Sequence, residues 1–153
     1  MQPFWDLVVR IDKCFVKLLK PNPSGMVTRV THGIKISVQS RYEEAHSRPG
    51  QQHYFFSYQI EIENNGEYTV QLLRRHWFIF DSAGMRHEVE GEGVIGQQPV
   101  LNPGESYTYD SACNLTSEIG TMHGAYLFRR EVDGYLFEVQ IPKFELIALH
   151  RLN

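Results

Sequence analysis

An alternation of apolar and polar residues, which begins near Thr28 and recurs to the end of the chain, constrains the fold more than any other feature. In two of these runs the apolar members are Val30, Ile34, Ile36 and Val38, and Phe56, Tyr58, Ile60 and Ile62. A period of two turns one side of a strand toward a core and the other toward solvent. The alternation therefore predicts half-buried β-strands, with the first run broken near Gly33.

Turn-forming residues punctuate these runs. They include Asn64-Asn65-Gly66-Glu67, Asn102-Pro103-Gly104-Glu105 and Val132-Asp133-Gly134, and we expect hairpins at the first and the last. Residues 43–52 are polar and are expected to form an exposed loop. About seven or eight strands at such spacing are typical of an antiparallel β-sandwich of immunoglobulin or fibronectin type III-like architecture. The Cys–Trp–Cys disulfide pattern of antibody domains is absent, which favours the fibronectin-like relatives.

Residues 68–80 differ from the other runs because they are apolar on both faces. The pattern places Val70, Leu72, Phe78 and Phe80 on one face and Leu73, Trp77 and Ile79 on the other. Such a strand is expected at the centre of a sheet and covered on both sides. Near the end of the chain, Pro142 interrupts the final run, which predicts an edge strand or a bulge.

The first 25 residues follow a different period. Their apolar residues recur at helical spacing and are Phe4, Leu7, Val8, Ile11, Phe15, Leu18 and Leu19. This spacing predicts an amphipathic helix, ended by the linker Pro21-Asn22-Pro23-Ser24-Gly25. The apolar face would dock on the domain itself, on a partner chain or on a membrane surface. We therefore divide the chain into a helical extension with its linker (1–25) and a sandwich domain (26–153).

Composition and motifs exclude several function classes. A net charge of −3 gives no basic field for nucleic acid, and no apolar run of about 18 residues is present to span a membrane. Cys14 and Cys113 are two lone cysteines, and no signal peptide is evident, so a cytoplasmic protein is expected. No nucleophile elbow or activated Cys–His pattern stands out. The chain is accordingly expected not to be an enzyme.

The run from Glu90 to Glu105 carries glycines in G-x-G-x-x-G spacing at Gly91, Gly93 and Gly96. Prolines and turn residues follow it in place of a helix, which argues against a dinucleotide fingerprint. Two interpretations stay open. The glycines serve a bulge and a tight corner between strands, or their N–H groups cradle an anion. In the second case Arg74, Arg75 and Arg86 are the cations that would hold a phosphate.

The carboxylates before this run suggest a cation site. Glu88, Glu90 and Glu92 stand two apart, so one strand face would carry all three as ligands for a hard cation such as Mg²⁺; the alternative is a solvated edge. The histidines show no paired metal-ligand spacing. His76 and His123 are expected to be hydrogen-bonded structural histidines, and Trp77 and Tyr126 to lie in the core. Ser111 and Cys113 are candidates to lie near His123 in space.

Several motifs resemble those of the bacterial ApaG proteins. They are the segment from Thr31-His32-Gly33-Ile34 to Tyr42, Arg75-His76-Trp77, Gly91-Glu92-Gly93-Val94-Ile95-Gly96-Gln97-Gln98-Pro99 and Met122-His123-Gly124-Ala125-Tyr126. The closing Phe137-Glu138-Val139-Gln140-Ile141-Pro142-Lys143-Phe144 is similar to the family's C-terminal signature. The likeness runs from about Met26 to the end, and the first 25 residues have no counterpart in the family pattern.

The resemblance implies a fibronectin-type sandwich without established catalytic activity. It also implies a role linked to cobalt resistance and magnesium efflux, with binding of phosphate-bearing ligands such as pyrophosphate or nucleotides at the glycine-rich loop, together with Mg²⁺ or Co²⁺. Similar domains in eukaryotic F-box and polymerase-interacting proteins resemble protein-interaction modules. A protein partner bound through a sheet face or edge is therefore the alternative function. Oligomeric state is not predicted.

Overall fold

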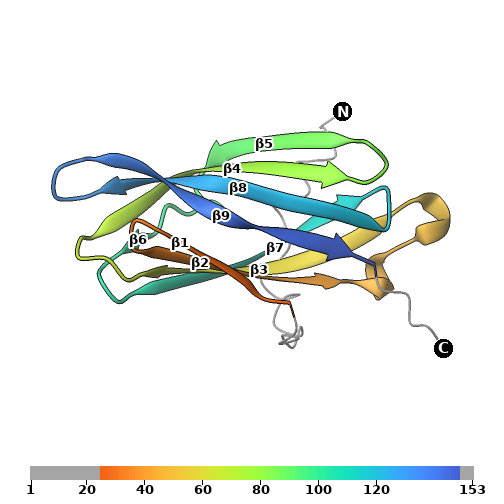
Figure 1. Cartoon of the computed structure of the whole chain (residues 1–153), viewed down its shortest axis with the longest axis horizontal. Coiled ribbons are helices and arrows are strands. Elements are labelled where there is room, and N and C mark those ends of the chain that lie inside the picture. The colour runs from red at the N-terminus through yellow and green to blue at the C-terminus, as the bar shows by residue number, and fades with distance from the viewer. Residues whose placement is uncertain (1–24, 149–153) are drawn as a thin grey trace.

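The computed structural model describes residues 25–148, which form a sandwich of two antiparallel β-sheets (Figure 1). The strands are β1 (Val27–Thr31), β2 (Ile34–Tyr42), β3 (Tyr54–Asn64), β4 (Val70–Asp81), β5 (Arg86–Glu92), β6 (Val100–Leu101), β7 (Ser106–Leu115), β8 (Ile119–Arg130) and β9 (Leu136–Ile147). One sheet has the order β1-β2-β3-β7, and the other has the order β5-β4-β8-β9 with β6 paired to β4. The prediction of an all-β antiparallel sandwich is confirmed.

Nine strands are present in the described part of the chain, where about seven or eight were expected. The turn at His32 and Gly33, both with positive φ, divides the first run into β1 and β2, and β6 adds a strand of two residues. Between residues 25 and 148 the helical content is two short 3₁₀ turns, η2 (Glu44–His46) and η3 (Pro49–Gln51). No helix there is long and apolar enough to cross a membrane. The predicted N-terminal helix lies outside the described residues.

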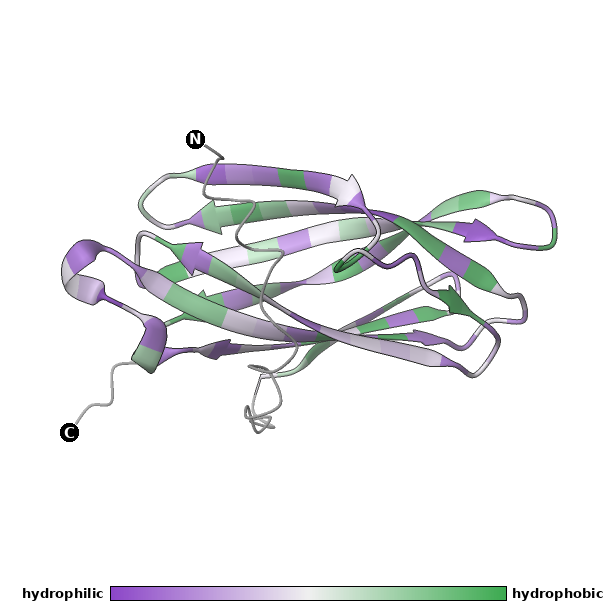
Figure 2. Ribbon diagram, turned by 180° about the vertical axis from the view of Figure 1, so that it is seen from behind, coloured by the Kyte–Doolittle hydropathy of each residue, from purple (hydrophilic) through white to green (hydrophobic). Residues whose placement is uncertain are grey.

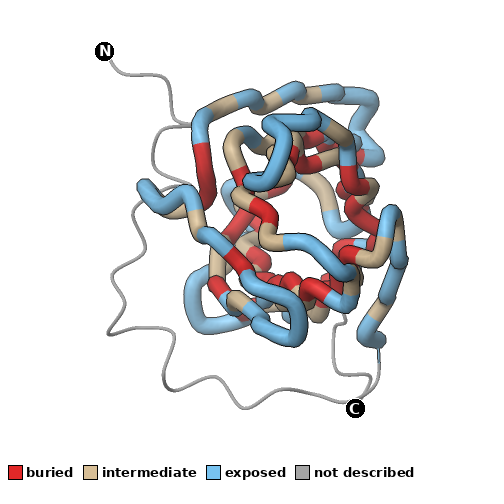
Figure 3. The backbone as a smooth tube through the Cα atoms, turned by 90° about the vertical axis from the view of Figure 1, so that its left-hand side faces the viewer, coloured by how far each residue is buried: buried red, intermediate tan, exposed pale blue. Residues whose placement is uncertain are grey.

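The core lies between the sheets, where the apolar positions of both sets of strands face one another (Figure 3). Ile36, Phe56 and Ile60 face inward from the first sheet, and Trp77 and Tyr126 face inward from the second. Trp77 and Tyr126 are therefore core residues, as predicted. Each large apolar side chain buried in this way contributes about 1.5–3 kcal/mol. The strands β1 and β9 contact each other and close one side of the sandwich, so β5 and β7 are the edges on the other side.

The prediction that residues 68–80 are covered on both faces is wrong. The pairing of β4 with β8 shifts register between Leu72 and Arg74, which is a β-bulge. One extra residue reverses the alternation that follows it. Phe78 and Phe80 therefore lie on the outer face of the five-stranded sheet, the side turned away from the other sheet, with 39% and 40% of their surface exposed. Val70 and Leu72 share the core with Trp77 and Ile79 instead.

The predicted hairpin at residues 64–67 is also wrong, because β3 and β4 belong to different sheets. The connection is held by Asn64, whose buried amide donates to the carbonyls of Tyr68 (2.8 Å) and Leu101 (2.9 Å). Its side-chain oxygen accepts from the N–H of Gly66 at 3.0 Å. The same Asn-rich signal that suits a hairpin here anchors a crossing between sheets, because a buried amide can satisfy three backbone groups.

Other local predictions hold. β8 and β9 form the hairpin closed by residues 131–135, and β9 is an edge strand with a register shift opposite His123, beside Pro142. The loop at residues 43–52 is mostly exposed. Glu43 is the exception, since it is buried and its carboxylate accepts a 2.6 Å hydrogen bond from Ser57.

Replacing Asn64 by Ala would leave the carbonyls of Tyr68 and Leu101 without their hydrogen-bond donor. We expect Asn64→Ala to lower the free energy of unfolding by about 2–4 kcal/mol. The neighbouring Asn65→Ala changes an exposed side chain and should stay within about 0.5 kcal/mol of the wild type. Urea unfolding of the three proteins measures this difference, and equal midpoints would contradict the anchoring role.

Asp81 gives a pH-dependent prediction. Burial raises the pKa of this carboxyl, but hydrogen bonds from Ser117, Thr116 and the Ala83 N–H outweigh burial and lower it below its ordinary 3.8. Because the folded pKa is depressed, the stabilisation is present above pH 3.8 and is lost as the pH falls through the folded value. Asp81→Asn should therefore cost about 2 kcal/mol at pH 7 and less near pH 3. Thermal unfolding at both pH values tests this, and a constant cost would refute the charge effect.

Candidate functional site

The glycine-rich loop after β5 owes its three glycines to three different constraints. A Cβ on Gly91 would lie 2.8 Å from Nη1 of Arg75, and a Cβ on Gly93 would lie 2.2 Å from the carbonyl oxygen of Gln97. Gly96 has open space around it but a φ of +69°, which glycine adopts without strain. The interpretation as a bulge and tight corner therefore accounts for all three positions.

Backbone N–H groups of this loop donate to carbonyls of the same chain. The N–H of Gly93 donates to Leu73 at 2.8 Å, and Val94 and Gln97 exchange hydrogen bonds of 2.8 and 3.0 Å across a two-residue turn. These three N–H groups are thus satisfied within the fold. The turn places Ile95 at a φ of +48°, a conformation that costs a β-branched residue roughly 1–2 kcal/mol. The loop retains this strain while Ile95 packs against the core.

Beneath the loop, a cavity of about 50 Å³ lies between the sheets on the side where β5 and β7 are the edges. It is called the Arg75 cavity below. Its lining residues are Tyr58, Arg75, Trp77, Ile79, Val89, Val94, Ile95, Tyr109, Ser111, Cys113 and Met122. Among residues 25–148, Arg75 is the only lining residue with a side chain that is charged at neutral pH. The cavity therefore combines apolar walls, a few hydroxyl groups and one positive charge.

The Arg75 guanidinium is held by backbone rather than by a carboxylate. Its Nη1 donates to the carbonyl oxygens of Glu92 (3.0 Å) and Gly93 (2.9 Å), which Gly91 permits by having no side chain. No aspartate or glutamate among residues 25–148 forms an ion pair with it. Neither Nε nor Nη2 of Arg75 has a hydrogen bond to these residues, which leaves the parallel Nε–H and Nη2–H donors available for an oxyanion.

The hydroxyl groups around the cavity are neutral donors at pH 7. Burial raises the pKa of Tyr58, Tyr109 and Tyr126, while the nearby Arg75 charge lowers each of them by a smaller amount. Tyr109 and Tyr126 hydrogen-bond to each other through their hydroxyl oxygens, and Ser111 hydrogen-bonds to Tyr58. Burial also raises the pKa of the Cys113 thiol to about 12, so this cysteine is not a nucleophile at neutral pH.

The structure separates the other predicted site residues from Arg75. Arg74 and Arg86 lie on the outer face, where Arg86 stands over the Phe80 ring at 5.7 Å. Glu88, Glu90 and Glu92 are exposed on that same face, as their spacing predicted. The proposal that Ser111 and Cys113 lie near His123 is wrong, because they face the interior while His123 stacks on Phe78 outside.

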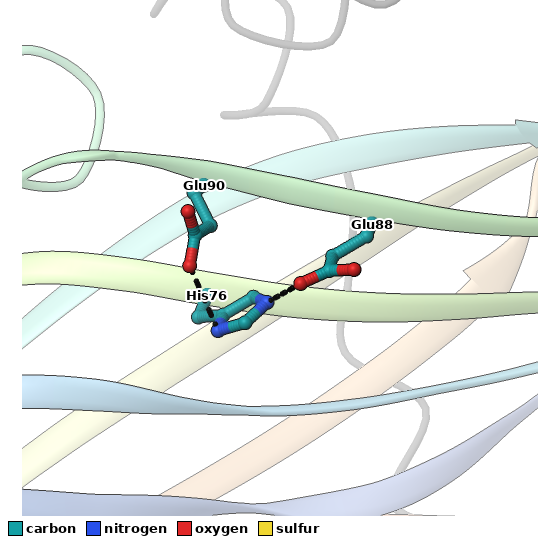
Figure 4. A group of neighbouring side chains, drawn as sticks. All are labelled: His76, Glu88 and Glu90. Atoms are coloured by element: carbon teal, nitrogen blue, oxygen red, sulfur yellow. Dashed lines mark hydrogen bonds and ion pairs between the residues drawn. The ribbon is translucent and has the colours of Figure 1, made fainter.

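On the outer face, His76 lies between two glutamates of the neighbouring strand (Figure 4). Its Nε2 is 2.5 Å from Glu88, and its Nδ1 is 3.1 Å from Glu90. His76 is thus hydrogen-bonded, as predicted, although it is partly exposed rather than buried. Its position beside the glutamates was not predicted. Counting outward from the turn after Asp81 would have paired it with Glu90, because β4 and β5 form a regular hairpin.

Together, the two sheets define a small antiparallel β-sandwich with a cavity on its open side. Residues 44–130 match the family model described as the ApaG domain, and the chain belongs to this family. A Protein ApaG from Methylorubrum populi is 49% identical over 120 residues, which cover 78% of this chain and 92% of that protein. One from Brucella canis is 46% identical over 121 residues, covering 79% and 92%.

A solved structure agrees. The crystal structure of a Bordetella pertussis protein described as ApaA aligns with a TM-score of 0.72 at 45% identity, covering 74% of this chain and 92% of that one. The resemblance to ApaG proteins found in the sequence motifs is therefore confirmed.

The glycine constraints can be separated by substitution. Gly93→Ala adds both a clash with the Gln97 carbonyl and positive-φ strain, and we expect a loss of about 2–4 kcal/mol in the free energy of unfolding. Gly96→Ala adds only the strain and should cost about 1–2 kcal/mol. Urea midpoints for the two variants provide the comparison. Equal losses would show that the Gly93–Gln97 approach does not constrain the loop.

Proposed function

We propose that this ApaG-domain protein is a non-catalytic binding protein that takes the phosphoryl end of an anionic ligand into the Arg75 cavity. The observation that carries the proposal is the state of Arg75: a guanidinium between two sheets, held by two backbone carbonyls and unpaired with any carboxylate in residues 25–148. A partly buried charge of this kind is stabilised when an anion binds it. Arginine binds phosphate through two parallel hydrogen bonds, and the Nε–H and Nη2–H groups of Arg75 provide this arrangement.

The size of the cavity limits what enters it. A water molecule needs roughly 10–15 Å³ of such a cavity, so about 50 Å³ leaves room for a few water-sized groups. A single phosphoryl or similar oxyanion group fits this description, whereas a whole nucleotide does not. The rest of a pyrophosphate or nucleotide would remain outside, next to the loop at Val94 and Ile95.

The arrangement of charge across the sheet favours the same ligand. Glu88, Glu90 and Glu92 would repel an anion near the loop if their side chains lay on the same face of the sheet as the cavity. They project from the outer face of β5, while Arg75 occupies the inner face. The part of the chain that the structure describes contributes no acidic side chain to the cavity wall. An anion in the cavity would therefore meet Arg75 and neutral hydroxyl groups first.

The link to cobalt resistance and magnesium efflux stays a prediction of the family resemblance, as do the cytoplasmic location and the absence of catalysis. A phosphate ligand that carries Mg²⁺ or Co²⁺ would connect such a role to the cavity. The raised pKa of the Cys113 thiol supports a binding role over catalysis, as does the lack of an acid–base pair among the described residues of the lining.

The proposal predicts that phosphate and pyrophosphate raise the unfolding temperature of the wild type. At a concentration of 100 times the dissociation constant, a ligand adds about 2.7 kcal/mol of stability. Arg75→Gln should abolish the rise, and Arg75→Lys should weaken it because an ammonium cannot bind in the forked manner. Isothermal titration calorimetry on the same proteins measures the binding directly.

Arg74→Gln is the matched control, since it removes the same charge one residue away on the outer face. It should keep the wild-type response. Each variant is first checked for a cooperative unfolding transition, because Arg75 also holds the loop. No binding of either anion by the wild type, or equal binding by Arg75→Gln and wild type, would refute the proposal.

A second candidate function is the protein-interaction module, and one observation favours it. Phe78 and Phe80 are adjacent exposed aromatics on a central strand, with His123 stacked on Phe78. Exposed aromatic residues of this kind are enriched where proteins bind one another. The two functions use opposite faces of the sheet, so a Phe78→Ser change should affect partner binding and leave phosphate binding unchanged.

A further inference from the structure

The outer face of the five-stranded sheet carries a donor set that the proposed phosphate site does not use. His76 of β4 and Glu90 of β5 are directly opposite in the register, and Glu88 is diagonal to His76. One ligand atom from each side chain can be chosen so that all three lie within 4.8 Å of one another. Figure 4 shows both carboxylates turned toward the imidazole ring. Glu92 lies opposite Arg74 instead, so the three-glutamate site expected from the spacing is replaced by one histidine and two glutamates.

We infer that His76, Glu88 and Glu90 form a binding site for a divalent first-row transition-metal ion, with Zn²⁺ as the reference case. One imidazole nitrogen and two carboxylate oxygens are a common donor set for Zn²⁺ and its neighbours. Mg²⁺ binds oxygen ligands and retains its waters, so a nitrogen donor disfavours it. The donor chemistry therefore changes the expected metal from the hard cation predicted by glutamates alone.

The distances permit closure around an ion without moving the backbone. Zinc binds nitrogen and carboxylate oxygen at about 2.0–2.2 Å, so two of its ligand atoms lie no more than about 4.4 Å apart. The ligand atoms of His76, Glu88 and Glu90 lie within 4.8 Å of one another, a separation slightly larger than zinc requires. Both glutamates are more than half exposed and can rotate. Two adjacent strands of one hairpin fix the positions from which the side chains start.

The two glutamates contact different nitrogens of the His76 ring, with Glu88 at Nε2 and Glu90 at Nδ1. A metal ion bound at one of these nitrogens would draw both carboxylates to that side of the ring. Two carboxylates and a neutral imidazole would balance the charge of a divalent ion. The Phe78 ring packs against His76 at 4.4 Å between centroids and is itself stacked with His123, which limits the movement of the His76 ring.

The test is isothermal titration of the untagged full chain with ZnCl₂, and with MgCl₂ as the comparison. The wild type should show a Zn²⁺ site that His76→Gln and Glu88→Gln each weaken by at least about tenfold, since even second-shell changes cost that much. Glu92→Gln is the matched control, because it removes an equal charge from the same strand face outside the cluster. It should bind Zn²⁺ like the wild type. Mg²⁺ should show no dependence on His76.

The metal site and the phosphate site are distinguished by the substitutions that affect each of them. His76→Gln should leave phosphate binding intact, and Arg75→Gln should leave Zn²⁺ binding intact, because the two sites occupy opposite faces. Absence of Zn²⁺ binding would overturn the inference. So would an unchanged affinity in His76→Gln, or an equal loss in Glu92→Gln, which would indicate diffuse attraction to an acidic surface. Urea unfolding confirms that each surface variant is folded.

Discussion

The contact of the Arg75 guanidinium with the carbonyls of Glu92 and Gly93 determines the open side of this sandwich. A cation is drawn between the sheets across a strand position that has no side chain, and there it holds the start of the loop. Gly93 and Gly96 then let the backbone turn sharply, which brings Val94 and Ile95 over the cavity. Changing Arg75 would therefore affect both the loop and the charge of the cavity.

The sheet itself separates the charges of the candidate site. Period-two alternation along β5 turns Glu88, Glu90 and Glu92 outward, and Figure 2 shows this strand at the top edge coloured mainly as hydrophilic. The bulge in β4 sets which of its two neighbouring arginines faces inward, so that Arg75 lines the cavity and Arg74 is outside. A chain with a slightly negative net charge thus places an isolated positive charge in an apolar cavity, at a depth where electrostatic interactions are less screened.

Most of the fold could be predicted from the sequence because alternation and turn chemistry act locally. The inward positions Phe56, Ile60 and Ile62, the β8–β9 hairpin and the disturbance at Pro142 all followed from neighbouring residues. The predictions that were wrong concern features of the fold that are determined by tertiary contacts. No local signal shows that Asn64 bonds to Leu101, or that a bulge after Leu72 turns Phe78 outward.

The candidate site was likewise predicted in part, with the rest determined by tertiary structure. Three arginines and three glutamates were predicted as ligands from their types, and alternation placed the glutamates on one face. Which arginine faces the cavity depends on the bulge, and the partnership of His76 with Glu88 and Glu90 depends on strand register. Tyr58, Tyr109 and Ser111 were not predicted as site residues, because they come from the opposite sheet.

The most direct test of the central claim is a phosphate titration followed by nuclear magnetic resonance of the arginine Nε–Hε groups and the backbone amides. We expect the Arg75 side-chain signal to shift together with the amides of Val94, Ile95 and Ser111, while the Arg74 and Arg86 signals stay in place. Shifts confined to Arg74 and Arg86 would place the anion on the outer face and contradict the account. Unchanged signals at saturating phosphate would show that the Arg75 cavity does not bind this anion.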